Sequence, residues 1–108
     1  MKEIADQDFG KEVLECQIPV AACFTTEWCH NCCSTCLFSD ELANEYQGEV
    51  KFVKVDAEKI PYVSAGQRIT AVPTIMIFKD SQPVKTLLGF QDRRLLRPLP
   101  DSIVGRSD

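Results

Sequence analysis

The sequence predicts an α/β fold with a central mixed sheet of four to five strands, flanked by helices and ending in a C-terminal β-hairpin. Runs typical of strands alternate with runs typical of helices, a pattern found in mixed sheets covered on both faces. The turn-forming sequence Asp80-Ser81-Gln82-Pro83 separates the last two strand-like runs, which indicates an antiparallel pair. With 108 residues, 44% of them hydrophobic, the chain is long enough for one core. We therefore expect a single domain over residues 1–108.

In the first half of the chain, a short segment at residues 2–5 is expected to add an edge strand. The spacing of apolar residues at 8–15 predicts a helix. Residues 20–25 are apolar and rich in β-formers, which predicts a strand. A long helix is expected over residues 29–46, ended by Gly48, because a glycine just past the last turn adopts the left-handed conformation of a helix end.

In the second half, residues 51–56, 74–79 and 84–89 have strand composition. Between the first two of these strands, residues 58–67 are expected to form a helix. Residues 93–97 are compatible with one helical turn, and the two prolines that follow prevent a longer helix there.

The net charge and the length of the apolar runs argue against two broad classes of function. A formal net charge of −4 and a pI near 5.0 argue against nucleic-acid binding, which favours a basic face. No apolar run approaches the roughly 20 residues of a membrane span. The first residues show no apolar core of a signal peptide, and six cysteines then indicate thiol chemistry or metal binding, not a framework of structural disulfides. We expect a cytoplasmic protein.

The pentapeptide Trp28-Cys29-His30-Asn31-Cys32 is the strongest functional signal. It contains the only tryptophan and the only histidine of the chain, and it lies between a predicted strand and a predicted helix. The free amides at a helix N-terminus stabilise a thiolate at Cys29. Cys32 follows one turn later, within reach to close a disulfide. The pattern predicts a redox site, the alternative being two core cysteines on a helix.

Several motifs in order give the chain its resemblance to the thioredoxin family, from about residue 8 to residue 90. The residues that carry it are Glu27-Trp28-Cys29-x-x-Cys32, Asp40-Glu41-Leu42-Ala43-Asn44-Glu45-Tyr46, Lys54-Val55-Asp56, Ile69-Thr70-Ala71-Val72-Pro73-Thr74 and Gly89. The resemblance implies the thioredoxin fold, with the dithiol at the start of its second helix. It also implies that Val72-Pro73 is a cis peptide beside the dithiol.

In such a site Cys29 is expected to be the nucleophile and the more exposed thiol. It attacks a substrate disulfide to form a mixed disulfide, which the more buried Cys32 then resolves. The resemblance further implies an apolar rim that docks extended peptides. Its members would be Trp28, Ala71, Val72, Pro73, Gly89 and Phe90. The alternative for Phe90, which we favour less, is plain core packing.

The chain departs from the family pattern between the two cysteines. His30 and Asn31 replace the usual Gly-Pro pair. Without the proline, Asn31 has a backbone N–H to donate, and an imidazolium at His30 would further stabilise the Cys29 thiolate. Because a stabilised thiolate makes the disulfide more oxidising, we expect a site less reducing than a typical thioredoxin. The alternative is that His30 is only a solvated loop residue.

A second departure is Cys23, where the family usually has a buried aspartate that assists proton transfer at the resolving cysteine. A buried thiol stays protonated at neutral pH and is a poor substitute. Lys54, which matches the family's buried lysine, would lack its acidic neighbour, and resolution would be slower. Cys23 is otherwise interpreted as a small apolar core residue.

Four cysteines lie on one stripe of the long predicted helix, namely Cys29, Cys32, Cys33 and Cys36. The stripe is open to interpretation as a relay, a redox sensor or a set of ligands for zinc or an iron–sulfur cluster. A straight helix cannot surround a metal, although a cluster shared between two chains would ease that objection. We expect Cys36 to face the sheet as a buried thiol and Cys33 to lie near the surface. Cys16 has no motif around it and is expected to pack in the core.

These observations predict a thiol–disulfide oxidoreductase that reduces protein disulfides through Cys29 and Cys32. No tightly bound cofactor is expected. The resemblance implies that electrons come from a separate flavin-containing reductase using NADPH, or from another dithiol. Two alternatives remain, a metal- or iron–sulfur-binding module and a redox-sensing docking protein on the same fold.

Overall fold

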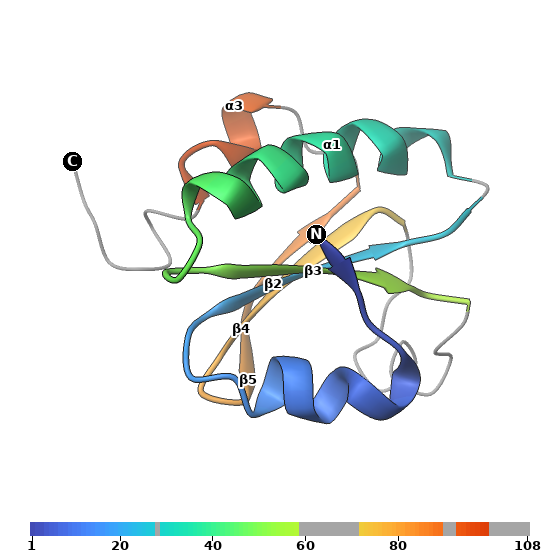
Figure 1. Cartoon of the computed structure of the whole chain (residues 1–108). Coiled ribbons are helices and arrows are strands. Elements are labelled where there is room, and N and C mark those ends of the chain that lie inside the picture. Colours follow the sequence, from blue (N-terminus) through green and yellow to red (C-terminus); the bar gives the residue numbers. More distant parts are fainter. Residues whose placement is uncertain (28, 59–71, 90–92, 100–108) are drawn as a thin grey trace.

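The computed structural model describes residues 1–27, 29–58, 72–89 and 93–99, shown in Figure 1. Within those ranges the side chains of residues 6, 30–34, 93 and 95 are not described. The predicted helix at 58–67 therefore lies, except for its first residue, outside the described residues. No helix in the described ranges is long and apolar enough to cross a bilayer.

The centre of the molecule is a mixed sheet of five strands in the order β1-β3-β2-β4-β5. The strands are β1 (Lys2–Glu3), β2 (Val20–Thr25), β3 (Lys51–Asp56), β4 (Thr74–Lys79) and β5 (Gln82–Leu88). The first three run parallel to one another, and β4 is antiparallel to both β2 and β5. The predicted mixed sheet with a closing hairpin is confirmed, and the predicted edge strand is present in shorter form.

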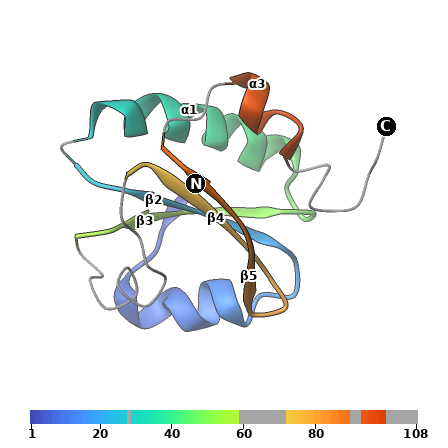
Figure 2. The same cartoon turned by 180° about the vertical axis from the view of Figure 1, so that it is seen from behind.

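Helices cover both faces of this sheet (Figures 1 and 2). On one face lie the long helix α1 (His30–Glu45) and the short helix α3 (Arg93–Leu96). The other face carries the N-terminal segments η1 (Asp6–Asp8) and η2 (Gly10–Leu14). After α1 the chain turns through Gly48, whose φ of +87° is the left-handed conformation expected of it. The single helical turn expected at residues 93–97 is also present.

The helical segment predicted at residues 8–15 is present, but it is not a regular α-helix. The segment is a 3-10 turn followed by a π-type turn, in which the Glu15 N–H donates to the carbonyl of Gly10 at 2.9 Å. Gly10 is a poor helix former, so it weakens regular α-helical spacing here. Phe9, at the junction of the two turns, is buried to 4% exposure. Packing of this ring, more than helix propensity, fixes the segment against the sheet.

Alternation along the strands divides the core into two clusters. The first cluster lies between the sheet and η1–η2, and its buried members are Ile4, Phe9, Val13, Val20, Ala22, Phe24, Val53, Val55, Met76 and Phe78. The second cluster lies on the other face, under α1 and α3, and its buried members are Ala21, Cys23, Phe38, Leu42, Val50, Phe52, Ile75, Ile77, Leu96 and Leu99. Successive residues of β2 thus face opposite layers, and Cys23 faces α1.

The hairpin between β4 and β5 has a shorter turn than the four residues expected at 80–83. Asp80 and Ser81 both have positive φ, at 54° and 66°, as a two-residue hairpin turn of the mirror-image type requires. Strand β5 already begins at Gln82 and includes Pro83. A proline is tolerated there because β5 is an edge strand, whose outward N–H groups have no ladder partner.

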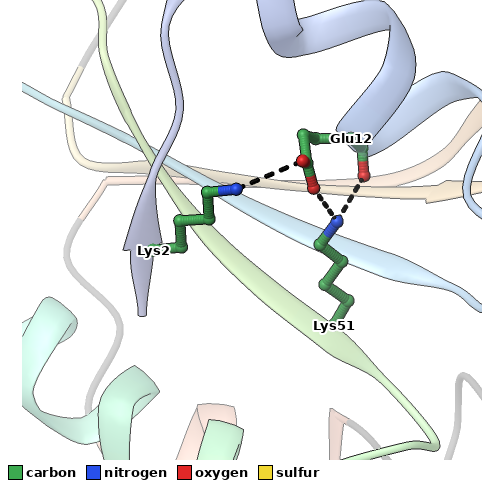
Figure 3. Close-up of polar contacts among 3 residues, drawn as sticks. All are labelled: Lys2, Glu12 and Lys51. Atoms are coloured by element: carbon green, nitrogen blue, oxygen red, sulfur yellow. Dashed lines mark hydrogen bonds and ion pairs between the residues drawn. The ribbon is translucent and has the colours of Figure 1, made fainter.

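A small ion cluster joins η2 to the sheet edge (Figure 3). Lys2 of β1 donates to the Glu12 carboxylate at 3.2 Å, and Lys51 of β3 contacts both that carboxylate and, at 3.0 Å, the Glu12 carbonyl. The hydrogen bond from Lys51, followed by that from Lys2, lowers the pKa of Glu12. Ion pairs of this partly exposed kind contribute little stability, so their main effect is to fix where η2 meets the strands.

Candidate functional site

The site lies at the edge of the sheet formed by strand ends, where β2, β3 and β5 end and β4 begins. In the register of the sheet, Thr25 at the end of β2 lies beside Asp56 at the end of β3. Thr74 at the start of β4 pairs on one side with Leu88 at the end of β5 and on the other side with Phe24 of β2. Residues just beyond these ends therefore lie at the same edge. They include Cys29, Val72-Pro73 and Gly89.

Cys29 occupies the position immediately before the first residue of α1, His30. Its N–H donates to the carbonyl of Thr26 at 3.3 Å, which closes the turn between β2 and the helix. The helix begins one residue later than expected, so Cys29 lies at its N-terminal cap, where the first-turn amides lack helical partners. Cys29 is disulfide-bonded and 9% exposed in this structure.

Several expected site residues lie outside the described part of the molecule. Trp28, Ala71 and Phe90 are not described. The backbone of the first turn of α1 is helical, but its side chains, which include those of His30, Asn31, Cys32 and Cys33, are not described. The roles expected of these residues, and the comparison of Cys29 with Cys32 in exposure, remain predictions.

At the same edge, Val72 and Pro73 come directly before β4, the strand next to β2 in the sheet. The Val72–Pro73 peptide bond is cis, Val72 is half-buried and Pro73 is buried. The carbonyl of Pro73 accepts a hydrogen bond of 2.9 Å from the N–H of Gly89. Gly89 has a φ of +81°, and a Cβ built there would meet no atom within 4 Å. Backbone conformation, not lack of space, therefore favours glycine at this position.

The structure also brings together two cysteines from different elements, Cys23 of β2 and Cys36 of α1. Cys23 is 2% exposed in the middle of β2, and its Sγ lies 3.9 Å from the Sγ of Cys36 on α1. Cys36 faces the sheet as expected, but it is half-buried and not fully buried. Lys54 is the register partner of Cys23 on β3. Alternation along β2 turns Cys23 toward α1, which is the one sequence signal that bears on this contact.

The two thiols of this pair have pKa values that move in opposite directions. Hydrogen bonding from Cys23 lowers the pKa of Cys36 to about 7, and the positive charge of Lys54 acts in the same direction. Burial of Cys36 and the negative charge of Asp40 oppose this shift. The same hydrogen bond, together with burial, raises the pKa of Cys23. Cys36 is thus the thiol of the pair that ionises first, and Cys23 stays protonated as its donor.

This asymmetry predicts a pH profile for the reactivity of Cys36. Because only the thiolate is alkylated, the rate of Cys36 labelling in the reduced protein should rise with pH and reach half its maximum near pH 7. In Cys23→Ala the stabilising donor is lost, so the midpoint should move upward, toward the ordinary thiol value of 9.0. Labelling by iodoacetamide followed by mass spectrometry measures both curves.

Cys16→Ser is the matched control for this experiment, because Cys16 packs against the first cluster on the opposite face of the sheet. It should leave the Cys36 profile unchanged. A wild-type midpoint near pH 9 that Cys23→Ala does not move would show that the hydrogen bond has no influence on Cys36.

The described side chains form no group of three or more cysteine, histidine or carboxylate residues placed to hold a metal ion. Of the four cysteines on the helical stripe, only Cys29 and Cys36 belong to that described set. Cys36 has Cys23 as its sulfur neighbour, and Cys29 is in a disulfide. No observation favours the metal-binding alternative.

Comparison with known proteins gives a consistent result. The thioredoxin family model matches residues 1–99. The chain is 42% identical over 86 residues to thioredoxin 1 of Synechococcus elongatus, covering 80% of each protein. It is 37% identical to thioredoxin 1 of a Nostoc species over 81% of each. It is also 36% identical to the thioredoxin of Rickettsia felis, over 86% of this chain and 89% of that protein.

Proposed function

The chain belongs to the thioredoxin family and is a protein-disulfide oxidoreductase, and we propose that Cys29 and Cys32 are the dithiol it uses. One observation carries the assignment: Cys29 is disulfide-bonded at the cap of α1, while Cys16, Cys23 and Cys36 are free. Of the six cysteines of the chain, Cys32 and Cys33 are left as partners. Cys32, one turn into the helix, fits the pairing without distortion of the helix.

The reaction that follows is a two-step exchange. The Cys29 thiolate attacks one sulfur of a substrate disulfide, forms a mixed disulfide and releases the first substrate thiolate. Cys32 loses its proton and attacks Cys29 Sγ, which releases the second thiolate and forms the Cys29–Cys32 disulfide. Two electrons pass to the substrate, and the two cysteine protons end on the two substrate thiols. The free amides of the first turn of α1 stabilise the attacking thiolate.

The substrate would dock beside the dithiol on the rim formed by Val72, Pro73 and Gly89, with Trp28, Ala71 and Phe90 as further members. Support for this placement comes from the sheet register, which puts residues 72–73 and Gly89 at the same edge as Cys29. The Pro73–Gly89 hydrogen bond holds the two rim segments together. An extended peptide with a disulfide is the chemistry that such a rim fits.

We expect His30 and Asn31 to make the site more oxidising than that of a thioredoxin with Gly-Pro between its cysteines. A stabilised Cys29 thiolate favours the dithiol form, which raises the reduction potential above the thioredoxin value of about −270 mV. Equilibration with glutathione buffers measures it. The double variant His30→Gly/Asn31→Pro should lower the potential, and a wild-type value at or below about −270 mV would contradict the proposed role of these residues.

Cys23 would leave the resolving step without a buried carboxylate. The structure has Cys23 and Cys36 beside Lys54 at this interface, and no carboxylate occupies position 23. Because the raised pKa of Cys23 keeps it protonated, it is a weak proton acceptor. We therefore expect slower resolution by Cys32 than a carboxylate at position 23 would support.

Disulfide-containing proteins and a thioredoxin reductase are the partners that family membership implies. We propose that this reductase is a flavoenzyme using NADPH and that the chain itself binds no cofactor tightly. We place the protein in the cytoplasm, since a chain with four cysteines beyond its redox pair is best kept reduced in a reducing compartment.

Turnover of insulin disulfides tests the proposal. With dithiothreitol as electron source, the protein should accelerate insulin reduction catalytically, many turnovers per molecule. Stoichiometric formation of a mixed disulfide with no turnover would instead identify a redox-sensing docking protein on this fold.

A further inference from the structure

A pair of thiols lies at the interface of β2 and α1, apart from the proposed catalytic dithiol. Cys23 and Cys36 are 13 positions apart in the sequence, on either side of Cys29, and their sulfurs are 3.9 Å apart. Cys23 is buried in the sheet, and Cys36 packs half-buried above it against the second cluster. Neither sulfur is a reacting atom in the exchange at Cys29.

The distance between these sulfurs is short enough for a covalent bond to form after a local adjustment. A disulfide needs about 2.05 Å between the sulfurs, so closure requires an approach of about 1.9 Å. The side chains already point at one another from facing layers, and rotation of the half-buried Cys36 side chain can supply such a movement.

The two thiols also differ in the way an attacking and a resolving cysteine must differ. Cys36 is the more accessible of the two, and Lys54 favours its thiolate. A thiol with a pKa near the ambient pH is the most effective attacker in disulfide exchange. Cys23 is buried and protonated, so a small disulfide in solution does not reach it directly. Such a cysteine is suited to resolve a mixed disulfide that first forms on Cys36.

We propose that Cys23 and Cys36 form a second two-electron redox couple of this chain, oxidised by low-molecular-weight disulfides. The Cys36 thiolate attacks one sulfur of the small disulfide, forms a mixed disulfide and releases one small thiolate. Cys23 then gives up its proton and attacks Cys36 Sγ, which releases the second small thiolate. The couple loses two electrons, the small disulfide gains them, and the two cysteine protons end on the two small thiols.

A Cys23–Cys36 bond would tie the strand before Cys29 to the helix after it. It would also remove the thiolate that faces Lys54. The proposal does not depend on the assignment of the catalytic dithiol, because neither of its cysteines takes part in it. The two claims can therefore fail separately.

The test is redox titration of a variant that lacks the first site, Cys29→Ser/Cys32→Ser/Cys33→Ser, which retains Cys16, Cys23 and Cys36. The folded variant is equilibrated anaerobically across ratios of reduced to oxidised glutathione, then denatured and alkylated. No lysine or arginine lies between Lys11 and Lys51, so trypsin leaves all six cysteine positions on one peptide. Cleavage after glutamate separates residues 16–27 from residues 28–41 and makes a link between them visible.

Cys23 and Cys36 should lose labelling together as the buffer becomes more oxidising, with a loss of two hydrogen masses and a link between the two peptides. Cys16, on the opposite face of the sheet, is the internal control and should stay fully labelled. Full labelling of Cys23 at every ratio, or a glutathione adduct on Cys36 that never links to Cys23, would overturn the proposal. The same digest of the oxidised wild-type protein decides the question if the triple variant does not fold, and absence of the Cys23–Cys36 link there refutes it.

Discussion

Replacing Cys29 by serine is expected to reduce the rate of insulin disulfide reduction by at least about a thousandfold, down to the uncatalysed background. A serine hydroxyl is not ionised at neutral pH and does not form a mixed disulfide. The variant therefore loses the first step of the exchange, and no later step can compensate. The rate of insulin precipitation with dithiothreitol, measured over a range of protein concentrations, gives the loss directly.

Cys16→Ser is the matched control for this experiment, since it removes a cysteine of the first cluster, on the face of the sheet away from α1. It should retain the wild-type rate within a factor of about two, because Cys16 is half-buried on the opposite face of the sheet and takes no part in the exchange. If Cys29→Ser kept a substantial part of the activity, the nucleophile would have to be another cysteine.

The second large effect concerns stability. Phe9→Ala should lower the free energy of unfolding by about 3–5 kcal/mol, a large part of the stability of an ordinary domain. Phe9 is 4% exposed, and its ring lies edge-on to Phe78 with centroids 5.7 Å apart and tilted against Phe24 at 6.5 Å. The truncation leaves a cavity in the first cluster and removes the anchor of η1–η2. Urea unfolding followed by circular dichroism measures the difference.

Leu37→Ala provides the comparison for Phe9→Ala. Leu37 is on α1 but 67% exposed, so its truncation should change the free energy of unfolding by no more than about 0.5 kcal/mol. Equal losses for the two variants would show that the N-terminal segment does not depend on the packing of Phe9.

The sheet was the most predictable part of the fold. The strands at 20–25, 51–56 and 74–79 have the expected bounds. The first and third are nearly continuous buried apolar runs, and the second has buried apolar residues among its charged ones. The N-terminal helical segment was predicted, but not its 3-10 and π-type form. Gly10 and the packing of Phe9 decide that form, and neither is visible in apolar periodicity. The hairpin turn was predicted at the correct place but with too many residues. Pro83 was interpreted as a turn residue, whereas it belongs to edge strand β5.

In the site, local sequence was enough to place Cys29 at the start of the long helix. The residues before it have strand composition and those after it helix composition, so the helix N-terminus had to lie near Cys29. The Cys23–Cys36 contact was missed for a physical reason. The contact depends on how α1 packs on β2. Neither strand alternation nor helical spacing alone specifies this packing. The stripe of four cysteines suggested a relation along the helix, whereas the neighbour of Cys36 lies on the strand beneath it.

The most direct test of the central claim is site-resolved alkylation of the wild-type protein after anaerobic equilibration across a series of redox buffers, with each cysteine read by tandem mass spectrometry. We predict that Cys29 and Cys32 lose labelling together along a single two-electron curve and are linked to one another in the oxidised protein. If Cys29 remained labelled at every potential, or were linked to Cys33 while Cys32 stayed free, the assignment of the catalytic dithiol would be wrong.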